Sequence, residues 1–81
     1  MDAAKLVMMA NQIGRFFAGQ RGTDPVVGIA DHLEKFWEPP MRAAIIAHLA
    51  AGGTGLDGPL RDAVGRLDGM RTGRLGAGLK N

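Results

Sequence analysis

The chain has 81 residues, a formal net charge of +2 and no cysteine. A chain of this length forms at most one domain and buries only about 60–65% of its unfolded surface, which argues against a deep, enclosed active site. The lack of cysteine excludes thiolate catalysis, cysteine-ligated zinc, iron–sulfur clusters and disulfides. Serine and tyrosine are absent as well, so the commonest hydroxyl nucleophile and the phenolic acid are missing. The composition therefore disfavours an independent enzyme.

The positive charge is concentrated at the C-terminal end. Residues 1–70 hold seven basic and eight acidic side chains, so seven minus eight gives a net charge of −1, and Arg71, Arg74 and Lys80 add +3. The nearly neutral body offers no groove that would follow a phosphate backbone. An alternative is a small helical protein that binds nucleic acid or has a regulatory role and uses the basic tail. A steep salt dependence of DNA or RNA binding would support this alternative.

Hydropathy predicts neither a membrane anchor nor a secretion signal. No run approaches the roughly 20 apolar residues that span a bilayer. The apolar stretch Leu6–Ala10 is preceded by Asp2 in place of a basic leader and is interrupted by Asn11 and Gln12. We therefore expect a cytoplasmic protein with no membrane partner and no nucleic-acid partner.

Two helices are predicted in the first half of the chain. Apolar residues recur at helical spacing from Asp2 to Ala18, and Gly19 ends this helix. Asp24 is a suitable N-cap for a second helix that begins at Pro25. Because a residue that precedes proline disfavours the α conformation, the second helix is expected to end near Glu38.

Two more helices are predicted in the second half. The third, from Pro40 to about Ala51, is apolar nearly all round, which indicates a central position or a partner that covers it. A short fourth helix follows Gly58 and Pro59 and ends near residue 70. The predicted fold class is all-α, a small bundle of about four short helices in residues 1–70, with a flexible, Gly-rich, basic tail in residues 71–81.

Residues 53–58 spell G-x-G-x-x-G, the pattern of dinucleotide-binding loops. That fingerprint requires a preceding strand and a following long helix within a βαβ unit. Here a helix is predicted before the pattern, so the glycines are expected to end one helix and turn into the next. We expect no cofactor, no metal and no catalytic residue in this chain.

Three polar side chains lie within the predicted helices. His32 and His48 have no nearby cysteine to complete a metal site, and both are interpreted as partly buried or interface histidines. Arg42 lies at the start of the third helix, where a cation is unfavourable unless an anion offsets it. We expect an intrachain ion pair or a partner's anion beside Arg42.

Trp37 is the only tryptophan and lies where the second helix meets Pro39 and Pro40. A large, rigid side chain at such a hinge, within reach of water, is typical of a docking anchor. Phe16, Phe17 and Phe36 lie on apolar helix stripes, which favours a protein core or a protein interface over base stacking.

Two segments carry a resemblance to a known family. They are "MANQIGRFF", Met9–Phe17, and "GIADHLEKFWEPPMRAAIIAHL", Gly28–Leu49. A third segment, "LRDAVGRL", Leu60–Leu67, matches the family's last helix. Together they resemble the delta subunit of the soluble, NAD-dependent, molybdenum-containing formate dehydrogenases. The likeness covers most of residues 5–67, and the tail after Met70 departs from it.

The resemblance implies a small non-catalytic subunit that binds the large alpha subunit and assists assembly, cofactor maturation or stability. It implies a complex with beta and gamma subunits that carries bis-molybdopterin guanine dinucleotide, iron–sulfur clusters, FMN and NAD. The motif residues then become candidates for partner binding: Asn11, Gln12, Phe16, Phe17, Phe36, Trp37, Pro39, Met41 and Arg42.

Overall fold

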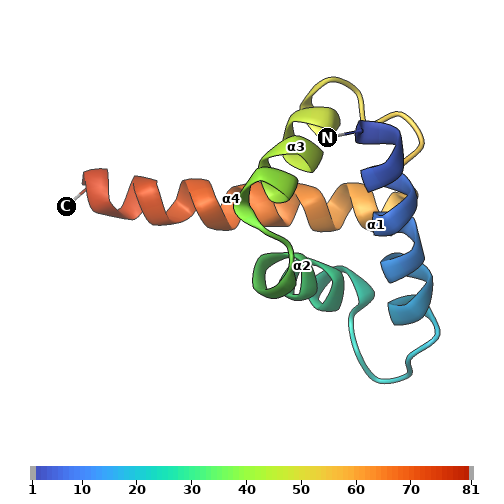
Figure 1. Cartoon of the computed structure of the whole chain (residues 1–81). Helices are drawn as coiled ribbons and strands as arrows, with labels where there is room; N and C mark the ends of the chain where they lie inside the picture. Colours follow the sequence, from blue (N-terminus) through green and yellow to red (C-terminus); the bar gives the residue numbers. More distant parts are fainter. Residues whose placement is uncertain (1, 81) are drawn as a thin grey trace.

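A computed structural model describes the backbone of residues 2–80 and the side chains of residues 2–69. Within this part of the chain there are four helices and no strand, which confirms the predicted all-α class. Helix α4 crosses the molecule, and α1, α2 and α3 pack against its first half (Figure 1). The most extensive of these contacts joins α4 to α2.

Helices α1, Ala3–Ala18, and α2, Pro25–Phe36, begin at aspartate caps. The Asp2 carboxylate accepts the Ala4 amide, and the Asp24 carboxylate accepts the Val26 amide, each at 3.0 Å. These bonds satisfy amides that have no partner within the helix. The predicted start at Pro25 and the predicted end at Gly19 are confirmed.

Helix α3, Pro39–Ala50, begins one residue earlier than expected and ends one residue earlier. Helix α2 ends at Phe36, two residues before the predicted Glu38, because Trp37 and Glu38 are both extended. For Glu38 this is the conformation that a residue before proline favours. The two helices are therefore joined by a very short link at which the chain reverses direction.

The core is formed by apolar side chains from all four helices and the loop before α4. The fully buried side chains of largest volume are Ile29, Leu33, Ile45, Leu60 and Val64. Among the described residues no polar or charged side chain is buried. Where α1 meets α4, Gly14 allows such a close approach that a Cβ there would lie 2.2 Å from Leu60 Cδ2.

Helix α4 is longer than the sequence predicts. It runs from Gly58 to Lys80, past the expected end near residue 70, and its last turns extend away from the other helices (Figure 1). The arginine, leucine, alanine and lysine between its glycines are good helix formers, whereas each glycine costs about 1 kcal/mol relative to alanine. Mobility of residues 71–81 stays a prediction.

Two adjacent aromatic residues, both expected on the apolar stripe of the second helix, have opposite environments. Trp37 is only 6% exposed, so the expectation that water reaches it is wrong. It follows Ile29 and Leu33 at intervals of four residues, and the last turn of α2 therefore carries it onto the same buried stripe. Phe36, expected on that stripe, is 71% exposed.

Candidate protein-interaction surface

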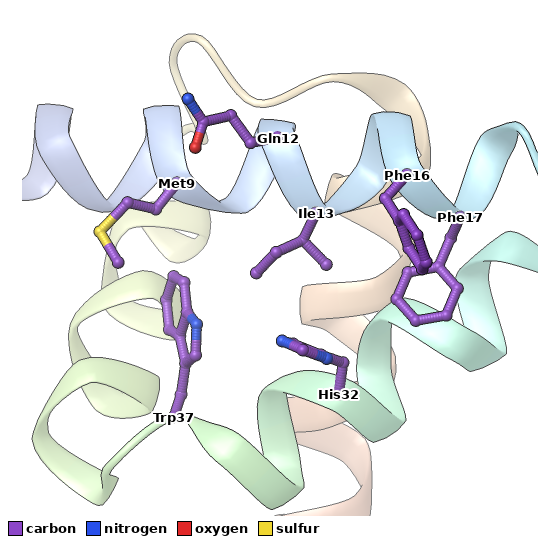
Figure 2. A pocket seen from close by; sticks show the side chains of 7 residues that line it. All are labelled: Met9, Gln12, Ile13, Phe16, Phe17, His32 and Trp37. Carbon is purple, nitrogen blue, oxygen red and sulfur yellow. The ribbon is translucent and has the colours of Figure 1, made fainter.

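An open groove lies between α1 and the C-terminal half of α2. It has a volume of about 440 Å³, and we call it the aromatic groove; it is lined by Met9, Gln12, Ile13, Phe16, Phe17, His32 and Trp37. Figure 2 shows Ile13 and His32 pointing into the same space, with Trp37 at one end and the two phenylalanines at the other. None of the seven lining side chains is an acid, a lysine or an arginine.

A row of ring contacts continues the groove onto the surface. The rings of Phe16 and Phe17 meet edge to face with centroids 5.3 Å apart, and Phe17 lies 6.1 Å from His32. His32 in turn lies 4.8 Å from Phe36. Phe16 is 62% exposed and Phe36 71% exposed, so both ends of the row present ring surface to water.

Helical periodicity places these side chains together. Met9, Gln12, Ile13, Phe16 and Phe17 follow one another at the three- and four-residue intervals that keep side chains on one side of α1. On α2, His32 and Phe36 are likewise four residues apart. Gly28 permits the two helices to approach, because a Cβ at Gly28 would meet the Phe17 ring at 2.7 Å.

Five of the nine predicted interface residues meet at this surface. Four of them line the aromatic groove, and the fifth, Phe36, contacts His32 beside it; the four are Gln12, Phe16, Phe17 and Trp37. Met9 and Ile13 were not among the predicted interface residues, whereas His32 was predicted to be partly buried or at an interface, and it lines the groove. The four-residue intervals that join Met9 and Ile13 to Phe17 on α1 are the signal that could have identified these two residues.

Asn11 lies elsewhere and holds the glycine loop that precedes α4. Its Nδ2 donates to the Gly55 carbonyl at 2.9 Å, and its Oδ1 accepts the Asp57 amide at 3.0 Å. Helix α3 also contacts this loop through His48, whose Nε2 lies 2.8 Å from the Thr54 carbonyl oxygen. Because a carbonyl only accepts, this geometry assigns the proton to Nε2.

The backbone of this loop makes the turn that the sequence predicts. Gly52, Gly53 and Gly55 have φ angles of +124°, +66° and +86°, a region that favours glycine. Arg61 of α4 donates from Nη1 to the Gly53 carbonyl and from Nη2 to the Gly52 carbonyl, both at 3.0 Å. The loop is therefore tied to α1, α3 and α4.

The amide groups of the loop are largely used within the chain. The Gly52 amide donates to the Leu49 carbonyl at 3.0 Å, and the Gly53 amide donates to the His48 carbonyl at 2.9 Å. The Leu56 amide donates to the Gly53 carbonyl at 3.0 Å. The Asp57 amide donates to Asn11 Oδ1, also at 3.0 Å. A phosphate-binding loop needs such amides to point at the ligand, so this geometry does not fit a dinucleotide site.

Arg42 also makes contacts within the chain. Its Nη1 donates to the Glu34 carbonyl at 3.0 Å and to the Trp37 carbonyl. The C-terminal end of α2, which carries partial negative charge, thus supplies the acceptors that the position of Arg42 requires. Pro39 is exposed at the first turn of α3, and Met41 packs half-buried against the core, so neither lines the groove.

The described side chains offer no metal site, since no three His, Asp or Glu residues among them form a group that could hold an ion. Within the same part of the chain, no helix has the combination of length and hydropathy that crossing a membrane requires.

Comparison with known proteins identifies the family. The model of the NADH-dependent formate dehydrogenase delta subunit FdsD matches residues 5–64. Searches of curated proteins and of solved structures found no match. The matched range includes the whole aromatic groove and the glycine loop, and it ends within α4. The chain therefore belongs to the family of NADH-dependent formate dehydrogenase delta subunits.

Proposed function

We propose that this chain is a non-catalytic accessory subunit that binds the large, molybdopterin-bearing alpha subunit of formate dehydrogenase in the cytoplasm. Binding occurs through the aromatic groove and supports assembly, cofactor maturation or stability of the large subunit. In this proposal the bis-molybdopterin guanine dinucleotide, iron–sulfur clusters, FMN and NAD belong to the alpha, beta and gamma subunits. The delta subunit itself holds no cofactor.

The observation that carries the proposal is the pair of exposed phenylalanines beside an uncharged groove. Phe16 and Phe36 are 62% and 71% exposed, although a phenylalanine gains about 1.5–3 kcal/mol when it leaves water. Aromatic side chains around a pocket that excludes charged groups are typical of the central part of protein interfaces. A partner that covers this surface would bury both rings.

The test is recovery of the alpha subunit by affinity purification after co-expression of the complex. We expect the double substitution F16Q and F36Q to lower recovery at least tenfold, because interface aromatics of this kind often contribute 2 kcal/mol or more. Since both rings are exposed in the free chain, circular dichroism and thermal unfolding of the variant alone should stay close to wild type.

Val27→Gln is the matched control. Val27 is a 42% exposed apolar residue of α2, and it does not line the aromatic groove. Its substitution should leave recovery unchanged. If the double variant keeps its helix content and recovers the alpha subunit as well as wild type does, the aromatic groove is not the docking surface and the proposal is wrong.

A further inference from the structure

The shape of the aromatic groove limits what can occupy it. Its lining residues on α1 extend from Met9 to Phe17, which at 1.5 Å per residue is about 12 Å, or two helical turns. The described part of the chain contains no strand, so no sheet edge is available for an extended segment to pair with. An amphipathic helix that lays large apolar side chains into the groove is the recognition mode that this length and this apolar lining favour.

The charge at one end of the groove adds a second constraint. Lys5 precedes Met9 by one turn, and Gln12 and Phe16 continue the same row along α1 at helical intervals. Lys5 is exposed and forms no ion pair with any residue that the structure describes. On α2, by contrast, Lys35 Nζ is already paired with Asp31 Oδ2 at 3.2 Å.

The position of Lys5 within α1 is electrostatically unfavourable. It lies in the first turn, close to the positive end of the helix, where an acid would be stabilising. A carboxylate supplied by a partner helix would offset this repulsion and would fix the end of that helix beside Lys5.

We infer that the aromatic groove receives an amphipathic helix of the alpha subunit, with large apolar side chains at intervals of three or four residues and an Asp or Glu that meets Lys5. This inference rests on the proposed function. It adds the secondary structure of the docking segment and the sign of its charge.

Charge reversal at Lys5 tests the ion pair without weakening the fold. Lys5→Glu places an acid in the first turn of α1 after the Asp2 cap, an arrangement that stabilises helices. We therefore expect unfolding of the free variant at or above the wild-type temperature, but at least fivefold lower recovery of the alpha subunit at low salt. The deficit should shrink at high salt, because ions screen exposed charges. Arg66→Glu, on the exposed side of α4, is the control and should leave recovery unchanged.

Carbodiimide coupling of the purified complex identifies the occupant. This reagent condenses a lysine amine with a carboxylate in direct contact, and mass spectrometry locates the linked peptides. We expect Lys5 to be joined to an Asp or Glu of the alpha subunit whose neighbours show large apolar residues three, four or seven positions away. Lys5→Arg keeps the charge and should abolish the link.

The outcomes separate this inference from the proposed function. If the double variant F16Q and F36Q lowers recovery of the alpha subunit while Lys5→Glu does not, the proposed accessory function stands. The inference of a docking helix with an acid beside Lys5 is then wrong. If neither variant lowers recovery, both are wrong. A Lys5 link to a second copy of this chain, or to an alpha-subunit segment without the apolar spacing, also overturns the inference.

Discussion

Gly14 of α1 lies directly against Leu60 of α4, so close that a Cβ on Gly14 would meet Leu60 Cδ2 at 2.2 Å. Leu60 is 1% exposed and belongs to the buried core, so its side chain can give way only against other core side chains. We expect Gly14→Ala to destabilise the chain by about 1–3 kcal/mol, because overpacking outweighs the roughly 1 kcal/mol that alanine gains over glycine in a helix. Urea unfolding measures this difference.

Gly65→Ala is the control for this substitution. A Cβ at Gly65 would lie 3.9 Å from Leu49 Cδ2, an ordinary contact, and Gly65 is exposed within α4. This variant should be as stable as wild type or up to about 1 kcal/mol more stable. Equal stability of the Gly14 and Gly65 variants would show that α1 and α4 are not packed as closely as described.

Asn11 was predicted to bind a partner, whereas its amide group holds the glycine loop. Asn11→Ala removes two hydrogen bonds, to Gly55 and Asp57, and should cost about 1–3 kcal/mol of unfolding free energy. The Asp57 amide should also exchange with solvent faster. Gln12→Ala, one residue further along and exposed, should change neither quantity; an equal loss in both variants would contradict the assigned role of Asn11.

The helices and most of their ends were predictable because the signals are local. Asp24 and Pro25 specify a helix start, and the prolines after Trp37 specify an end, whatever the rest of the chain does. The resemblance of "MANQIGRFF" and the Trp37 segment to the delta-subunit family was likewise readable from sequence, and the match over residues 5–64 confirms it.

The division of the motif residues between core and surface was not predictable in the same way. Periodicity places Phe36 and Trp37 on one stripe, but only tertiary packing decides which ring is covered. Asn11 and Arg42 were selected because they belong to the family motif. Their contacts within the chain, with the glycine loop and with the end of α2, depend on tertiary structure that the sequence does not show. The length of α4 was underestimated, since its glycines were read as helix breakers.

The G-x-G-x-x-G loop should not bind dinucleotides. Three of its amide groups donate within the chain, those of Gly53, Leu56 and Asp57, and Arg61 occupies the carbonyl of Gly53 and that of the preceding Gly52. Titration calorimetry with NAD and with FAD should therefore show no saturable binding by the purified chain. Binding at micromolar affinity would mean that the loop opens and that its hydrogen bonds are exchanged for a ligand.

Trp37 and Phe36 are adjacent aromatic residues with opposite environments, 6% and 71% exposed, and they allow a paired test of core against interface. Trp37→Ala should cost about 3–5 kcal/mol, the usual loss for a buried aromatic residue, which is a large share of the 5–15 kcal/mol typical of small domains. We expect this variant to lose helix content in circular dichroism near room temperature.

Phe36→Ala should leave the unfolding transition of the free chain within about 0.5 kcal/mol of wild type and lower recovery of the alpha subunit instead. The contrast follows from position. Trp37 joins the buried stripe of Ile29 and Leu33, whereas Phe36 is largely exposed and places its ring beside that of His32. A Trp37 variant that keeps its fold but loses the partner would return Trp37 to the role of docking anchor. It would also mean that the core cluster stays closed without the Trp37 ring.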